Sequence, residues 1–252
     1  LALVLIPILV IGGLVLYIQS NQSDIIKSEI AKLNQEHKGL IRIGDSELAL
    51  FENFPYISLK VYDVQVFETK EDNSPVIVDV KDIYIGFNLD DIINGNYDIQ
   101  SLKVEDGVFN IVIHENNTTN LQNSLASTSQ TTSSSTNVHF KKIEFKNLDI
   151  HTIDEVTNTD VEKFIYTGIG GFRLNDSLTT GHIDADFELN VIKNGDTTFI
   201  RKKHFEVHAD VEFNEYTGIL DIQPSGILME NGDLSWKVLS IQKRIWTSTF
   251  WS

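Results

Sequence analysis

Histidines and carboxylates alternate with apolar residues in two stretches of this 252-residue chain. Imidazole nitrogens and carboxylate oxygens bind divalent metals, so a row of them along one side of a strand is a candidate metal site. The rows are His182, Asp184 and Asp186 in the first stretch, and His204, Glu206, His208 and Asp210 in the second. This spacing is unspecific, because any half-buried strand alternates polar with core residues. We therefore interpret both rows as solvated strand faces and expect no bound metal.

Other patterns that carry chemistry are incomplete. Tyr166–Gly171 is rich in glycine but lacks the Lys-Ser/Thr pair of a phosphate-binding loop, and no helical pattern follows it, so a bulge or turn is favoured. No G-x-S-x-G motif occurs, and the serines gather in residues 123–136. The chain has no cysteine, which excludes disulfides, thiolate metal ligands and a cysteine nucleophile. The sequence predicts a protein that is not an enzyme and uses no cofactor.

The charge balance indicates which classes of partner this chain can bind. The chain has 36 acidic and 20 basic side chains and a net charge of −16, which argues against nucleic acid because phosphate binding depends on Lys and Arg. Its hydrophobic content of 41% is enough for a substantial core. The length suits one large β domain or two small ones.

The N-terminal stretch is strongly apolar. Residues 1–18 carry no charge, and about 20 such residues span the hydrocarbon core of a bilayer. A cleavable signal peptide has a shorter apolar run that ends in small residues, whereas this run ends in Leu16, Tyr17 and Ile18. We therefore predict a transmembrane anchor over residues 1–20.

A short amphipathic helix is predicted over residues 21–39. Ser23 or Asp24 provides an N-cap, the helix continues to about Glu36, and Gly39 is its expected end. This helix either lies on the membrane surface or packs against the β domain.

From residue 40 onward the hydrophobic period is two, which predicts strands. We divide this part into a first β region over 40–122, a flexible Ser/Thr-rich loop over 123–136 and a continuing amphipathic sheet over 137–236. The atypical tail, residues 237–252, is either a membrane-interface segment or a truncated or frame-shifted end.

Three loose copies of one pattern recur about forty residues apart. Each has two apolar residues two positions apart, followed by an acid or amide at Asp63, Asp106 or Asn147. We expect the second copy to form a turn at Glu105–Gly107. We also expect a helical turn at 89–93, before this copy.

Two later segments show the clearest alternation of all. Residues 181–191 and 204–213 each have apolar residues on one side and mainly acidic or other polar residues on the other. A hairpin with a connection longer than two residues is predicted around 194–196. Such strands leave one apolar face to be covered, and helical patterns that would cover it are nearly lacking after Gly39.

The arrangement over roughly residues 1–122 resembles the N-terminal region of AsmA-family proteins. The shared features are the apolar anchor, the short helix and three later segments. These segments are LFENFPYISLKVYDV (50–64), VKDIYI (80–85) and LKVEDGVFNI (102–111). Members of this family are similar to bridge-like lipid transfer proteins built from repeating β-groove units, and they are much longer than this chain.

The resemblance implies a fold, a location and a partner. We expect a mainly β fold in which the transmembrane helix and the short helix precede a curved antiparallel sheet, a partly open β-groove. The anchor would hold the chain in the inner membrane of a Gram-negative bacterium with its body in the periplasm. Phospholipid acyl chains would lie against the apolar side, and the protein would take part in phospholipid transport or outer-membrane biogenesis.

The side chains expected to line this groove come from both halves of the chain. They are Ile57, Leu59, Val61, Ile83, Ile85, Leu102, Val104, Ile183, Phe187, Leu189, Phe205, Val207 and Val211. The alternative is a non-catalytic β-sandwich whose apolar faces pack against each other and which acts in the cell envelope by binding a protein partner.

Overall fold

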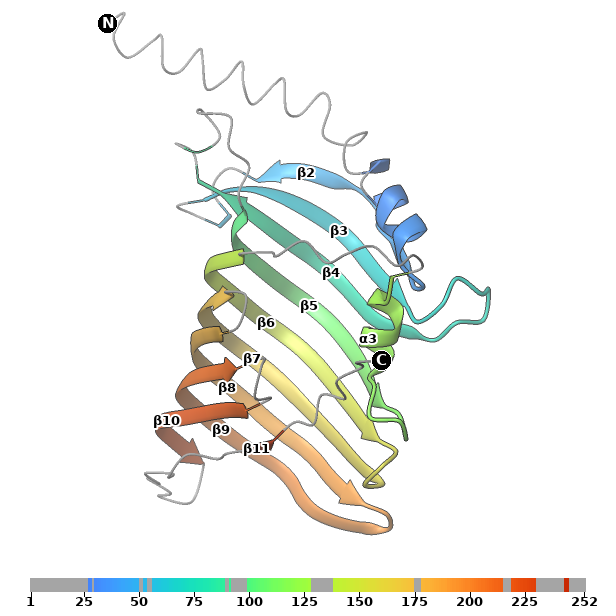
Figure 1. Ribbon diagram of the computed structural model, residues 1–252. Coiled ribbons are helices and arrows are strands. Elements are labelled where there is room, and N and C mark those ends of the chain that lie inside the picture. Colours follow the sequence, from blue (N-terminus) through green and yellow to red (C-terminus); the bar gives the residue numbers. More distant parts are fainter. Residues whose placement is uncertain are drawn as a thin grey trace, which may run out of the picture.

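The computed structural model describes residues 27–28, 30–49, 52–53, 56–88, 91, 99–127, 138–174, 178–214, 219–229 and 243–244. These residues form a mainly β fold, as predicted, in which one long curved sheet accounts for every described strand (Figure 1). A β-sandwich needs two sheets packed face to face, and the described residues contain only one.

The strands lengthen from the start of the sheet to its centre. They are β1 (Leu40–Arg42), β2 (Ser46–Ala49), β3 (Ile57–Phe67), β4 (Val76–Phe87), β5 (Ile99–Ile113), β6 (Val138–Asp154), β7 (Thr159–Leu174), β8 (Leu178–Asn194), β9 (Thr197–Asn214), β10 (Ile219–Met229) and β11 (Lys243–Arg244). Residues 30–36 are helical, and the helix α3 covers Asn120–Leu125. Residues 123–125, which the sequence assigns to a flexible loop, therefore belong to a helix.

Strand order follows the chain from β3 to β11, with β1 and β2 both paired to β3. Every pair is antiparallel except β5 and β6, which run parallel. The prediction of a wholly antiparallel sheet is wrong at this one place. A parallel pair needs a long crossover, and the connection between β5 and β6 is long enough because it contains α3.

The three repeated acid or amide residues have left-handed backbones inside strands. Their φ angles are 50° at Asp63, 56° at Asp106 and 53° at Asn147. Asp106 and Asn147 lie side by side on β5 and β6, and the Asn147 amide donates a hydrogen bond of 2.9 Å to the Asp106 carboxylate. Asp and Asn tolerate this conformation better than other residues. The expected turn at Glu105–Gly107 is therefore wrong, since β5 continues through it to Ile113.

These left-handed residues reverse the alternation of side chains along a strand. On β6, Phe145 pairs with Gly168 and Leu148 pairs with Ile165, although they are three positions apart. A Cβ placed on Gly168 would lie 3.5 Å from the Phe145 ring and 3.8 Å from the Ile165 side chain, so these groups share one face. The apolar face consequently continues across the line of left-handed residues.

We predict that Asn147→Val destabilises the fold. A β-branched side chain strongly disfavours a φ of 53°, so the free energy of unfolding should fall by about 1–3 kcal/mol in urea melts followed by circular dichroism. Asn147→Gly is the matched control, because it removes the same amide but tolerates the angle. Equal losses in the two variants would show that the side chain matters and the backbone angle does not.

Helical segments cover the β3–β5 part of one end of the sheet (Figure 1). The Gly39 and Lys38 amides donate hydrogen bonds to the Ser124 and Ala126 carbonyls, joining the chain after the first helix to α3. A Cβ on Gly39 would lie 2.3 Å from the Ser124 hydroxyl, so only glycine allows this approach. Leu121 of α3 packs against the hydrophobic core, which places α3 over the end of the apolar face.

The remaining sequence predictions about local structure have mixed outcomes. Residues 195–196 alone connect β8 to β9, so this hairpin is shorter than expected, and Gly195 has the positive φ that a tight turn needs. Residues 1–20, most of 89–93 and most of 237–252 lie outside the described residues. Within the described part of the chain, no helix is both long and apolar enough to cross a membrane.

Candidate functional site

The strand register gathers all of the predicted groove residues on one face of the sheet. On β3 and β4, Leu59 pairs with Ile85, and Val61 pairs with Ile83. The remaining pairs carry the same face across the sheet, and they are Ile57–Phe87, Ile85–Leu102, Ile83–Val104, Leu102–Ile143, Val104–Phe145, Gly170–Ile183, Gly181–Val211, Ala185–Val207, Phe187–Phe205 and Leu189–Lys203. We call this surface the apolar face.

The apolar face has a fully buried part around its centre. Val80, Val104 and Leu148 form one cluster with Ile77 and Val78. The partly buried residues packed against it come from both sides of the line of left-handed residues, and they are Val66, Ile83, Leu102, Phe109, Ile111, Leu121, Phe145, Ile150 and Ile165. This mixture confirms that the two halves of the apolar face are continuous.

Away from this cluster many of the apolar side chains are only half-buried, although Val61, Val64 and Ala209 are also buried. Phe187 and Phe205 stack with their ring centroids 5.5 Å apart, and both rings remain partly accessible. No second sheet lies among the described strands to cover them. Their partial exposure therefore leaves a surface suited to a long apolar ligand.

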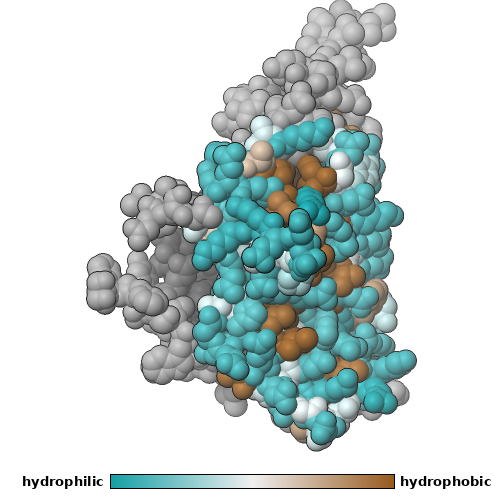
Figure 2. Space-filling model, turned by 90° about the vertical axis from the view of Figure 1, so that its right-hand side faces the viewer, coloured by the Kyte–Doolittle hydropathy of each residue, from teal (hydrophilic) through white to brown (hydrophobic). Residues whose placement is uncertain are grey.

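The outer surface of the molecule near α3 is mainly hydrophilic, unlike the apolar face. Figure 2 shows this side, where hydrophilic residues cover most of the surface and hydrophobic residues form smaller areas between them. The strand ends are thus mainly hydrophilic on this side.

The opposite side of the sheet, the polar face, holds a network of charges. Tyr84 is 3% exposed, and the Lys60 and Lys103 ammonium groups lie 5.1 and 4.9 Å from its ring centroid. Lys60 also pairs with Asp82 at 3.4 Å, and Lys103 pairs with Glu105 at 2.8 Å. Each of these lysines is therefore paired with a carboxylate, although Asp82 Oδ1 accepts no hydrogen bond from the described residues.

Two pKa shifts follow from this packing. Burial and then the nearby Glu52 carboxylate raise the pKa of Tyr84 far above its ordinary value, so its hydroxyl stays protonated. Burial opposes ionisation of Glu105, but Lys103 and Lys146 outweigh it and hold the pKa of Glu105 below its ordinary value. Both groups are therefore structural and not poised for proton transfer at neutral pH.

The two rows of histidines and carboxylates lie on the polar face, as predicted, and the structure shows that they contact each other. His182 bonds to Asp210 at 3.0 Å and to Asp184 at 3.1 Å, and His208 bonds to Asp184 at 2.5 Å. His204 pairs with Asp186 at 2.9 Å. The imidazoles and carboxylates are thus paired with one another.

This row makes stability depend on pH in a defined direction. Hydrogen bonds to Asp210 and then Asp184 raise the pKa of His182, so the stabilisation is complete below the unfolded value of about 6.5 and is lost as pH rises through the folded pKa. An NMR titration should give a His182 midpoint above that of an unfolded histidine and a lower midpoint in Asp210→Asn. Asp196→Asn in the β8–β9 hairpin should leave it unchanged. An unshifted His182 in the unaltered protein would contradict the hydrogen bonds.

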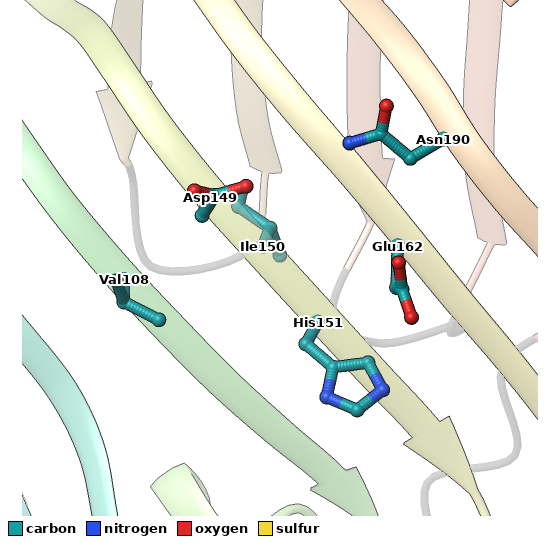
Figure 3. Close-up of a pocket in the computed structure, with 6 residues that line it drawn as sticks. All are labelled: Val108, Asp149, Ile150, His151, Glu162 and Asn190. Carbon is teal, nitrogen blue, oxygen red and sulfur yellow. The ribbon is translucent and has the colours of Figure 1, made fainter. Parts of the chain in front are cut away.

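A different group, which the sequence did not indicate, comes closest to a metal site. His151, Asp160 and Glu162 place one possible ligand atom each within 4.8 Å of one another. Figure 3 shows His151 and Glu162 beside a cavity of about 240 Å³ that Asn190 also lines. His151 already pairs with Asp160 at 2.7 Å, and these side chains are only half-buried. The ion pair between His151 and Asp160 therefore accounts for this group of side chains on the polar face.

Sequence reasoning also missed Lys163 on β7. Its neighbours in the register are Ile150 on β6 and Leu189 on β8, so it lies on the apolar face. The irregularity at Tyr166 on β7 hides this position, because Val161, Lys163 and Ile165 alternate out of step with Gly168 and Gly170. The only local signal is a lysine in an otherwise apolar row.

Comparison with models of known protein families and with curated proteins gave no match to this chain. The fold and the two chemically different faces therefore carry the functional argument.

Proposed function

We propose that this chain is a membrane-anchored periplasmic protein of the AsmA type, which holds phospholipid acyl chains on its apolar face and takes part in lipid transport or outer-membrane biogenesis. The single observation that carries the proposal is the continuous, half-buried apolar face of one open sheet. Residues 1–20 would anchor it in the inner membrane.

The energetics favour such a ligand. Each methylene group removed from water contributes about 0.8 kcal/mol, so even a partly covered acyl chain would be held. Contacts with valine, isoleucine, leucine and phenylalanine side chains are non-directional. A lipid could therefore slide along the face without a residue acting as a catalyst, and headgroups could remain in water at the edges of the sheet.

The helical segments at one end of the sheet favour entry of the acyl chains from elsewhere. Helix α3 and residues 37–39, joined by the Gly39–Ser124 and Lys38–Ala126 hydrogen bonds, cover the β3–β5 part of one end of the apolar face. In this proposal the chains enter from the opposite end or from the long edges of the sheet.

Native mass spectrometry of the full chain, released gently from detergent, tests the proposal. The expected result is a set of mass increments that match phospholipids and persist after delipidating washes of the detergent micelle. Lipid extraction followed by mass spectrometry would identify the headgroups. A folded chain free of lipid under conditions where added phospholipid is abundant would overturn the proposal.

A further inference from the structure

Lys163 is a cation surrounded by apolar side chains. It pairs with Ile150 and Leu189 across the sheet and lies between Val161 and Ile165 along β7. Ile150 and Ile165 belong to the shell of the hydrophobic core. A lysine in such a row costs stability unless its ammonium group finds an anion or reaches water.

No anion from the described part of the chain meets this requirement. Burial alone lowers the pKa of Lys163, with no carboxylate acting on it, and no ion pair joins it to the described residues. By contrast, Lys60, Lys103, Lys142 and Lys146 on the polar face are each within 3.7 Å of a carboxylate. Lys163 thus differs from these four lysines in its face and in having no carboxylate partner among the described residues.

A second lysine lies close by on the same face. Leu189 pairs with Lys163 on one side and with Lys203 of β9 on the other, so the two lysines are two strands apart, about 10 Å. Lys203 is exposed. The nearby carboxylates Glu188 and Glu206 lie opposite His204 and Asp186 in the strand register, on the polar face, and no ion pair joins them to either lysine in the described residues.

We propose that Lys163, assisted by Lys203, binds the anionic group of an amphipathic lipid, a phosphate or a carboxylate, whose acyl chain lies along the apolar face. This inference rests on the proposed function and narrows it to lipids with a negatively charged head. The anion would compensate the ammonium group, and the adjoining Leu189, Phe187 and Phe205 side chains would contact the first methylene groups of the chain.

The test compares lipids that share acyl chains and differ in the head. Binding of fluorescent phosphatidylglycerol, oleate and diacylglycerol to the full chain in detergent is measured for the unaltered protein, Lys163→Met and the control Lys81→Met, an exposed lysine of β4. We expect the unaltered protein and the control to prefer an anionic lipid over diacylglycerol by about tenfold, and Lys163→Met to lose this preference. Methionine removes an uncompensated charge, so the variant should fold and melt at a higher temperature.

The outcomes distinguish this inference from the proposed function on which it rests. Failure of the unaltered protein to bind any of the lipids would overturn both. Equal binding of anionic and neutral lipids, unchanged in Lys163→Met, would overturn the inference and leave the proposed function intact. A preference for phosphatidylglycerol or for oleate identifies the head as a phosphate or a carboxylate. Saturable binding of inorganic phosphate alone, without lipid preference, would also overturn the inference.

Discussion

Val104→Asp is expected to unfold the protein, whereas Val108→Asp four residues further along the same strand is expected to be harmless. Val104 is 5% exposed within the central cluster, while Val108 is 42% exposed beside the polar-face cavity. Burying an unpaired carboxylate there should cost about 3–5 kcal/mol, a large part of the stability of a typical domain. Urea melts of the two variants measure the difference.

This pair also tests the reversal of side-chain alternation at Asp106. In a regular strand, residues four apart point to the same face, so both substitutions would be equally damaging. The left-handed backbone at Asp106 places them on opposite faces. Similar destabilisation by the two aspartates would contradict the reversal, and tolerance of Val104→Asp would contradict the position of the core.

Phe187→Asp is expected to weaken lipid retention at least tenfold while preserving the fold. Phe187 is half-buried and stacks on Phe205 at one side of the apolar face, so a carboxylate there stays partly hydrated. Losing the contact area of one phenylalanine, about 1.5–3 kcal/mol, and adding a charge should weaken acyl-chain binding at least tenfold. Phospholipid extracted per chain, measured by mass spectrometry alongside circular dichroism, gives the result.

The matched control for this substitution is Tyr166→Asp. Tyr166 is an aromatic residue of β7 that is 38% exposed, and it packs against Phe164 and His204 on the polar face. The same change from an aromatic ring to aspartate should leave lipid retention at the level of the unaltered protein. A folded Phe187→Asp variant that keeps its lipid would place the ligand elsewhere.

The faces of the later strands could be predicted from sequence because their alternation is regular. Residues 181–191 and 204–211 keep a period of two, and the structure places Phe187, Leu189 and Val207 on one face as expected. The same regularity placed the histidine and carboxylate rows together on the other face. Where the backbone stays extended, residue parity is enough to assign a side.

Odd or even residue number no longer assigns a side chain to a face once a strand contains a left-handed residue. Asp106 followed by Gly107 predicts a turn, because both residues favour positive φ, but the same preference also serves a bulge inside a continuous strand. The sequence pattern at Asp63, Asp106 and Asn147 was visible as a repeat. Its meaning depended on neighbouring strands, which fix whether the chain reverses or continues.

Local sequence patterns also could not predict the direction of a strand or the position of an isolated charge. Alternation is the same in a parallel and an antiparallel strand, so the β5–β6 pairing could not be predicted. The ligand-like trio of His151, Asp160 and Glu162 depends on the register between β6 and β7, and the position of Lys163 depends on bulges. These features arise from tertiary pairing.

Site-specific photocrosslinking along β6 tests the central claim most directly. A benzophenone amino acid at Phe145 or Ile150 should crosslink to phospholipid, and the same group at Lys146 or Asp149 should not, because the left-handed Asn147 puts the first two on the apolar face. Crosslinked lipid is detected on the purified full chain by mass spectrometry. Crosslinking at Asp149 in place of Ile150, or at none of the four positions in a folded chain, would contradict a lipid-binding apolar face.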